Sequence, residues 1–363
     1  MKVVIVGGGV MGMMQARELS HKGIDVVLVD KGLCGTEASW AGGGIVSPLY
    51  PWRYSDPITA LSEWSQAYYP NLIQCLEAES DIDPELTRHG MLMLAVSGQE
   101  EALSWCGTRH PSWIEKIDAQ QLYQLEPELR AGCDGALWMP HIASVRNPRL
   151  LQALRVVLDR EPRVTVLEES GLESLLKKGD KVLGITTVRG EQVLGDAVVL
   201  CTGAWTQGLL GEESMGIEPV KGQMVLFEAK PGIVNRVVLN GGRYVIPRRD
   251  GRVVAGSTLE YQGFDKTTTQ SAHDELSDMA IDMFPALADF PVGHHWAGLR
   301  PGSPSGLPYI GKLPNSENLY VNAGHFRNGL VLAPASVRLM TSILTESELP
   351  IDPRPYDPCL RLA

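Results

Sequence analysis

Residues 2–12 read KVVIVGGGVMG, and they contain the strongest indication of the fold in the sequence. Its first five residues are mostly β-branched and apolar, as in a short buried strand, and glycines end the run. These glycines have the spacing Gly-x-Gly-x-x-Gly, at Gly7, Gly9 and Gly12. Residues 11–22 then have the pattern of a helix and residues 26–29 that of a second strand. This order predicts a βαβ unit, and hence an α/β fold with a Rossmann-like domain.

The glycine turn is typical of a dinucleotide site. Glycines allow a tight turn, through which backbone amides and the helix N-terminus approach a pyrophosphate. Asp30 follows the second strand, where a carboxylate can accept hydrogen bonds from ribose hydroxyls and repels a 2′-phosphate. The alternative is a purely structural turn. The strand, turn, helix and acid together favour a bound dinucleotide.

Two further segments favour FAD over NAD. Residues 38–45 read ASWAGGGI and follow Asp30 closely. A glycine run at this place lets the backbone pass along the ribityl chain and ring of a flavin. Residues 195–204, GDAVVLCTGA, are similar to the strand and Thr-Gly turn by which flavoproteins with two dinucleotide-binding domains return toward FAD. The alternative for this second segment is an ordinary buried strand and turn.

The rest of the chain indicates a second sheet. Helices are predicted at 61–78, 149–159 and 333–344, and strands at 163–167, 184–188, 192–194, 196–200, 223–228, 243–247, 252–256 and 319–322. Residues 138–148 are predicted to be irregular. We therefore expect a Rossmann-like FAD-binding domain interleaved with an α+β substrate domain that carries a mainly antiparallel sheet. The first comprises residues 1–80, 145–220 and 295–363, and the second residues 81–144 and 221–294.

The composition argues against several classes of function. The chain has 363 residues, with 32 Lys and Arg against 43 Asp and Glu and a net charge of −11, so neither nucleic acid nor an anionic membrane is an expected partner. The six cysteines form no CxxC pair and no cluster with histidine, so we expect no metal site and no disulfide framework. We see no signal peptide and no run of about 18 apolar residues. These features predict a cytoplasmic protein that acts on a small molecule.

Three segments in the C-terminal part have a more specific pattern. They read WAGLRPG at 296–302, GLPYIG at 306–311 and AGHFRNG at 323–329. Together with the N-terminal fingerprint, PVKG at 219–222 and YVIPR at 244–248, they resemble the D-amino-acid oxidase superfamily. Within it, they are similar to the bacterial glycine oxidases of the thiamine-biosynthetic type. The resemblance spans the chain and is weakest between residues 106 and 138.

The resemblance implies three substrate-binding residues. Arg300 would hold the substrate carboxylate in a bidentate pair, which a guanidinium offers and an ammonium does not. Tyr244 would donate a hydrogen bond to the same carboxylate, and Arg327 would lie at the edge of flavin and substrate. The alternatives are a surface ion pair for each arginine and simple core packing for Tyr244. His325 is either a base or a residue that orders its loop by hydrogen bonding.

The resemblance also implies which residues surround the FAD. They are Gly7, Gly9, Val10, Met11, Gly12, Asp30, Lys31, Ala38, Ser39, Gly43, Gly44, Ile45, Leu172, His325, Phe326, Arg327, Asn328, Gly329, Leu330 and Val331. No cysteine lies between Cys201 and Cys359, so a cysteinyl-flavin bond has no candidate residue near Arg300 and the FAD should be non-covalent. Two departures from the family pattern, Leu259 and Trp40, leave the size of the substrate pocket open.

By the resemblance we expect an FAD-dependent amino-acid oxidase. Glycine, sarcosine or a small D-amino acid would transfer a hydride to flavin N5, and the imine would hydrolyse to a keto acid, glyoxylate in the case of glycine, and ammonia. Oxygen would take the electrons and give hydrogen peroxide. No catalytic acid or base is required, because the protein orients the reactants. The alternatives are a D-amino-acid dehydrogenase that reduces a quinone and a non-catalytic dinucleotide-binding protein. The family also suggests a homo-oligomer.

Overall fold

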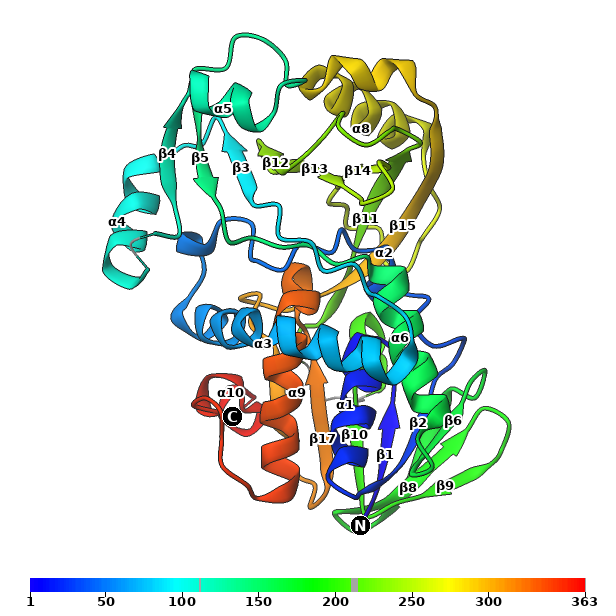
Figure 1. Cartoon of the computed structure of the whole chain (residues 1–363). Coiled ribbons are helices and arrows are strands. Elements are labelled where there is room, and N and C mark those ends of the chain that lie inside the picture. The colour runs from blue at the N-terminus through cyan, green and yellow to red at the C-terminus, as the bar shows by residue number, and fades with distance from the viewer. Residues whose placement is uncertain (111, 210–214, 363) are drawn as a thin grey trace.

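The structure is a computed structural model that describes residues 1–110, 112–209 and 215–362. Figure 1 shows two parts, one above the other. The lower part holds both chain ends and a six-stranded sheet, and the upper part holds an eight-stranded sheet. The site described below lies where the two parts meet.

The six-stranded sheet has the order β16-β17-β10-β1-β2-β6. Its strands are β1 (Lys2–Val6), β2 (Asp25–Val29), β6 (Val164–Leu167), β10 (Ala197–Leu200), β16 (Tyr309–Lys312) and β17 (Leu319–Ala323). All neighbours pair in parallel except β16 and β17. Both faces of the sheet are covered, which explains why β1 and β10 are nearly continuous apolar runs. The predicted βαβ unit and Rossmann-like sheet are confirmed.

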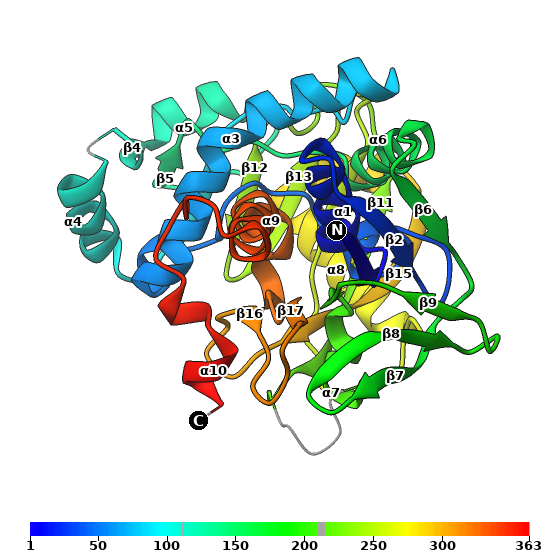
Figure 2. The same cartoon turned by 90° about the horizontal axis from the view of Figure 1, so that it is seen from below.

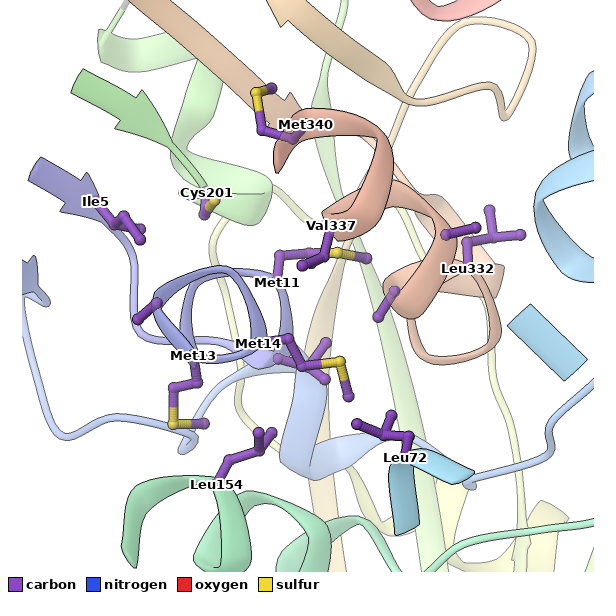
Figure 3. Close-up of a cluster of buried hydrophobic side chains, with 14 of the residues drawn as sticks. Ile5, Met11, Met13, Met14, Leu72, Leu154, Cys201, Leu332, Val337 and Met340 are labelled. Atoms are coloured by element: carbon purple, nitrogen blue, oxygen red, sulfur yellow. The ribbon is translucent and has the colours of Figure 1, made fainter. Parts of the chain in front are cut away.

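Helices cover one face of this sheet. They are α1 (Val10–His21), α3 (Asp56–Ser80), α6 (Asn147–Arg160) and α9 (Gly329–Thr345). Figure 3 shows methionines of α1 among side chains of the other three helices, including Leu72, Leu154 and Val337. The flexible methionine side chains fill the irregular space between these helices. The three predicted helices are confirmed, and α9 begins four residues earlier than the sequence indicates.

A three-stranded sheet covers the opposite face. It consists of β7 (Leu172–Lys178), β8 (Lys181–Thr187) and β9 (Gln192–Leu194), and it is seen at the lower right of Figure 2. Val182 and Ile185 of β8 pack in one cluster with Val4 and Val198 of the six-stranded sheet. The predicted hairpin of β8 and β9 is confirmed. β7 was not predicted, because its residues are half-buried or exposed and do not alternate regularly.

The eight-stranded sheet has the order β15-β11-β14-β13-β12-β3-β5-β4. Its strands are β3 (Met91–Leu94), β4 (Glu115–Asp118), β5 (Gly135–Met139), β11 (Glu218–Phe227), β12 (Val237–Asn240), β13 (Arg243–Pro247), β14 (Val253–Gly256) and β15 (Val292–Gly302). Only the pair β12 and β3 is parallel, so the expected mainly antiparallel sheet is confirmed. Helix α8 (Gln270–Met283) contributes Leu276 and Ala280 to the core against this sheet.

Shorter helices complete the chain. They are α2 (Ala38–Ala41), α4 (Gln99–Arg109), α5 (Ala119–Leu125), α7 (Thr206–Leu209) and α10 (Pro358–Arg361), with short 3₁₀ turns at Pro51–Arg53, Gly203–Trp205, Pro285–Asp289, Phe326–Asn328 and Arg354–Tyr356. The segment predicted to be irregular begins two residues later than expected, because Trp138 and Met139 belong to β5. In the described ranges no helix is long and apolar enough to cross a membrane.

β11 and β15 connect the two parts. They pair over nearly their whole length, from Glu218 opposite Gly302 to Phe227 opposite Val292. Both strands run across positions at which the sequence suggests a domain boundary, residues 220–221 and 294–295. The division into two domains therefore stays a proposal, in which these two long strands are shared by both.

Candidate active site

A cavity of about 490 Å³ lies between the two large sheets. Its lining includes the residues after β1, β2 and β10, the first turns of α1 and α9, and residues of β11, β13 and β15. Ligands of open α/β sheets bind at the carboxyl ends of the strands, which is where this cavity opens. Its volume is in the range of cofactor and ligand pockets.

The structure brings the predicted site residues together around this cavity. Its lining contains the three proposed substrate residues Tyr244, Arg300 and Arg327 and the proposed cofactor residues Gly7, Gly9, Val10, Met11, Asp30, Lys31, Ala38, Ser39, Gly43, Gly44, Ile45, Leu172, His325, Phe326, Asn328, Gly329, Leu330 and Val331. Of the predicted set, Gly12 alone does not line it. Which of these residues contact cofactor or substrate stays a prediction.

The backbone of the glycine turn is so tightly packed that side chains would clash there. Because glycines have no side chain, the turn leaves room for a ligand. Gly7 has a φ of +107°, and a Cβ there would lie 2.4 Å from the carbonyl oxygen of Cys201. A Cβ at Gly12 would lie 1.8 Å from the carbonyl oxygen of Gly7. Gly12 therefore acts by letting α1 pack closely against the turn, which explains why it lies outside the cavity.

Asp30 is fixed at the end of β2 by backbone groups. Its carboxylate accepts hydrogen bonds from Gly8 N at 2.6 Å and Gly32 N at 2.8 Å. Burial raises the pKa of Asp30, and the two N–H groups act against this shift. The side chain of the next residue, Lys31, also lines the cavity, and its Nζ lies 3.1 Å from the centre of the Trp205 ring. This arrangement suits the ribose of a dinucleotide.

The second glycine run passes between the two sheets. A Cβ at Gly43 would lie 2.7 Å from Ile246 Cδ1, and one at Gly44, whose φ is +84°, would lie 2.1 Å from the carbonyl oxygen of Val145. Arg248 donates hydrogen bonds to the carbonyl oxygens of Gly43 at 2.9 Å and Val145 at 3.0 Å. Burial lowers the pKa of Arg248 to about 10. The run is therefore held along the cavity wall by Arg248, the last residue of the YVIPR segment, to which the sequence alone assigns no role.

Arg300 presents a cation to the cavity. Its guanidinium donates hydrogen bonds to Ser257 Oγ at 2.7 Å and to the carbonyl oxygens of Lys221 and Thr258, each at 3.2 Å. Burial lowers its pKa, and the nearby Arg327 acts in the same direction, whereas Tyr244 opposes both. No Asp or Glu side chain of the described residues forms an ion pair with Arg300. A half-buried cation in this state favours an anionic ligand such as a carboxylate.

The side chains beside Arg300 offer no strong base. Tyr244 is 8% exposed and lies on β13, and Arg327 is exposed. His325 is buried, its Nε2 lies 3.0 Å from Ser336 Oγ, and burial lowers its pKa to about 3. His325 is therefore neutral near pH 7 and joins its loop to α9, which favours the loop-ordering role over that of a base.

Several aromatic side chains near the second glycine run lie outside the cavity lining. Trp40 packs against His294 and Trp296, with ring centres 6.1 and 5.7 Å away. Tyr50 and Trp52 contact each other at 5.7 Å. Leu259, the other departure from the family pattern, is 42% exposed. None of these four side chains belongs to the lining of the cavity.

Sequence motifs missed other polar residues of the lining. Asn147 donates from Nδ2 to the carbonyl oxygen of Ser39 at 2.7 Å, and Asn322 lies at the end of β17. Both side chains are 1% exposed. An Asn-Pro pair at 147–148 signals a helix start, but nothing local to either asparagine indicates a contact across the sheet.

The cavity fits FAD. One end has a glycine turn, a helix N-terminus and a ribose-binding acid, and the backbone along the wall admits no side chain at Gly43 or Gly44. At the other end lies Arg300, a cation that has no acidic partner among the described residues. A site for an acidic substrate requires such a cation. These features match the two halves of a flavin dinucleotide site and a site for an acidic substrate beside it.

Comparisons with known proteins lead to the same cofactor. The family described as FAD dependent oxidoreductase matches residues 2–343. A glycine oxidase of Pseudomonas aeruginosa is 48% identical over 365 aligned residues, which cover 99% of each chain. The crystal structure of glycine oxidase from Geobacillus kaustophilus is 28% identical with a TM-score of 0.91, covering 98% of this chain and 97% of its own.

A further structural relative acts on another amine. The iminodiacetate oxidase of Chelativorans sp. is 26% identical with a TM-score of 0.86, covering 98% of both chains. The family predicted from the sequence is thus confirmed over almost the whole chain. The chain belongs to the FAD-dependent oxidoreductase family in which these glycine oxidases are found, and it is an FAD-dependent amino-acid oxidase.

Proposed function

We propose that this enzyme oxidises glycine, or an amino acid of similar size such as sarcosine or a small D-amino acid. The products would be the imine, which hydrolyses to a keto acid and ammonia, and hydrogen peroxide. For glycine the keto acid is glyoxylate. The names of the relatives support the substrate class, and the high identity to one of them, 48%, supports it most.

The proposal depends most on Arg300, a cation in the cavity that has no acidic partner among the described residues. Its guanidinium lines the cavity, and its three protein acceptors are a hydroxyl and two carbonyl oxygens. No acidic side chain of the described residues compensates the positive charge of Arg300. A substrate carboxylate would therefore supply the missing negative charge. Tyr244, which lines the same cavity, would donate a hydroxyl hydrogen bond to that carboxylate.

Bound FAD supplies an acceptor for the hydride of the substrate α-carbon. The residues of the chain contribute orientation rather than proton transfer. Arg300 and Tyr244 hold the carboxylate, which fixes where the α-carbon and the neutral amine lie. Asp30 is bonded to the glycine turn, and the lining Glu37 pairs with Lys266 at 3.0 Å, so neither carboxylate is free to act as a base.

We also propose that the FAD is held without a covalent bond. Cys201 lines the cavity, but burial raises the pKa of its thiol to about 12. A protonated thiol is a poor nucleophile. No other cysteine occurs between Cys201 and Cys359, the interval that contains Arg300. Acid precipitation should therefore release the flavin into the supernatant.

Steady-state kinetics with purified enzyme test the proposed reaction. Glycine, sarcosine, D-alanine and iminodiacetate are compared at equal concentration, with oxygen uptake, hydrogen peroxide and ammonia measured together. We expect the highest kcat/KM with one of the first three, and equal amounts of peroxide and oxidised substrate. A preference for iminodiacetate would mean that the substrate is not glycine or an amino acid of similar size. Turnover that requires a quinone and consumes no oxygen would favour the dehydrogenase alternative.

A further inference from the structure

Asn322 is a buried amide without a partner in the protein. It lies at the carboxyl end of β17, opposite Ile310 of β16. Its side chain is 1% exposed and lines the cavity. Neither Oδ1 nor Nδ2 has a hydrogen-bond partner within residues 1–110, 112–209 and 215–362. Because buried amides are nearly always hydrogen-bonded, such a side chain points to a bound ligand.

Asn318, four residues earlier, is an asparagine whose side-chain oxygen and nitrogen are both hydrogen-bonded within the protein. Its Oδ1 accepts from Val182 N at 2.8 Å. Its Nδ2 donates to the carbonyl oxygens of Val182 and Asp196, both at 2.7 Å. Asn318 thus joins β8 to the six-stranded sheet. The contrast indicates that Asn322 has a role other than packing.

The alternation along β17 places Asn322 on the helical side of the sheet. Leu319, Val321 and Ala323 pack in the cluster shared with the three-stranded sheet. Tyr320 packs instead with the cluster of α1, α3, α6 and α9. Since successive side chains of a strand point to opposite faces, Asn322 lies on the same side as Tyr320. On that side the first turns of α1 and α9 also line the cavity.

The strand order places Asn322 at the flavin end of the site. Asp30, which suits a ribose, follows β2, and the glycine turn, which suits the pyrophosphate, follows β1. A dinucleotide lying across the strand ends in this direction next meets β10 and then β17. The group that follows the pyrophosphate in FAD is the ribityl chain.

We propose that the Asn322 carboxamide binds the ribityl hydroxyls of FAD. An amide has one acceptor oxygen and two donor hydrogens, and hydroxyls both donate and accept, so they can satisfy Oδ1 as well as Nδ2. A phosphate only accepts and would leave Oδ1 unpaired. The inference depends on FAD binding and not on which amino acid is oxidised, so failure of the proposed substrate leaves it standing.

The test uses the full chain after removal of its cofactor, with the variants Asn322→Val and Asn322→Ala. FAD affinity is measured by fluorescence titration, and ADP affinity by competition, since ADP keeps adenosine and both phosphates but lacks the ribityl chain. We expect the FAD dissociation constant to rise about tenfold, corresponding to about one lost hydrogen bond to a buried group, with ADP affinity unchanged. The cofactor-free variants should melt no lower than the parent, because they lose an unpaired amide.

Asn318→Ala is the matched control, because it removes a fully bonded amide from the residue directly before the same strand. It should lower the melting temperature with and without FAD and leave FAD affinity unchanged. An FAD dissociation constant within about twofold of the parent in the Asn322 variants would overturn the proposal. So would equal losses of FAD and ADP affinity, which would put the contact at the pyrophosphate. Cofactor-free melting that falls as in the control would make Asn322 structural and overturn it as well.

Discussion

At the scale of single residues, the proposed role of Arg300 gives the sharpest expectation. Arg300→Ala should lower kcat/KM for glycine by roughly 100-fold, mainly through KM, since losing a buried charged contact costs about 3 kcal/mol. FAD content should stay at the parental level. The control is Arg252→Ala, which removes an ion pair with Glu228 and Asp250 away from the cavity. An unchanged KM in the Arg300 variant would remove this residue from the substrate site.

His325 predicts how stability depends on pH. Its pKa in the folded chain is about 3, against an ordinary value of 6.5, so between these values only the unfolded chain takes up the proton. Stability should therefore fall as the pH decreases below 6.5, by about 2 kcal/mol at about pH 5 from this residue alone. Urea unfolding at about pH 7.5 and about pH 5 measures the loss.

The variant His325→Gln should lose correspondingly less stability on acidification, because glutamine does not titrate. The exposed His141→Gln serves as control and should keep the full parental loss. Equal losses in the His325 variant and the parent would mean that His325 is already protonated or is not buried in the folded chain.

How much of the site can be predicted depends on whether its residues belong to a local motif. Gly7, Asp30 and Arg300 stand in recognisable sequence patterns, and all three line the cavity. Arg248 ends the YVIPR segment and Asn322 lies in a predicted strand, but neither pattern indicates a role, because the importance of both residues comes from contacts that the fold makes. Arg248 reaches Gly43, 205 positions away in the sequence. No local spacing carries that information.

At the scale of elements, the pairing of β11 with β15 controls where the guanidinium lies. Gly222 pairs with Gly298, and a Cβ at Gly222 would lie 2.2 Å from Nη2 of Arg300. The nearest atoms belong to the end of a flexible side chain, so Gly222→Ala should fold with its guanidinium displaced. We expect KM for glycine to rise about tenfold with FAD retained, as for a misplaced carboxylate ligand.

Gly107→Ala provides the comparison for this variant. It lies in α4, where a Cβ would meet nothing within 4 Å, and alanine in a helix should stabilise it by up to about 1 kcal/mol. Steady-state kinetics and thermal melting of both variants are sufficient. If Gly222→Ala kept the parental KM, Arg300 would not be positioned by this strand pair.

Regular elements were easier to predict than irregular ones. β1 and β10 are nearly continuous apolar runs and were identified from the sequence. β15 was missed, since the sequence VGHHWAGLRPG mixes histidines, glycines and a proline and does not alternate. Residues of β15 serve the site instead of a regular strand pattern. Trp296 donates to the carbonyl oxygen of Ala41 at 3.0 Å, and Arg300 lines the cavity. Sequence patterns fail where function overrides the strand pattern.

At the scale of the whole molecule, the cavity between the two sheets predicts that FAD stabilises the fold. A ligand that binds only the folded chain adds about 2.7 kcal/mol at a concentration of 100 times its Kd. The melting temperature of cofactor-free enzyme should therefore rise by several degrees with added FAD and continue to rise with concentration. Riboflavin, which lacks the pyrophosphate for the glycine turn, should have little effect. A melting temperature insensitive to FAD would contradict the placement of the cofactor between the two sheets.

The fold class could be predicted from the sequence almost entirely. How the part with the six-stranded sheet connects to the part with the eight-stranded sheet could not. The βαβ unit, the antiparallel sheet and the FAD-dependent family were all anticipated and are confirmed. A strand at 223–228, which overlaps β11, was predicted, but β15 and its pairing with β11 were not, because the pairing of residues such as Val220 and Arg300 is set by tertiary contacts.

The absorbance spectrum of purified enzyme mixed anaerobically with glycine tests directly whether the enzyme oxidises a small amino acid. We expect that the flavin absorption bands bleach, that air restores them, and that sarcosine or a small D-amino acid acts in the same way. Flavin bands that remain unchanged with all of these substrates would contradict oxidation of a small amino acid by this enzyme.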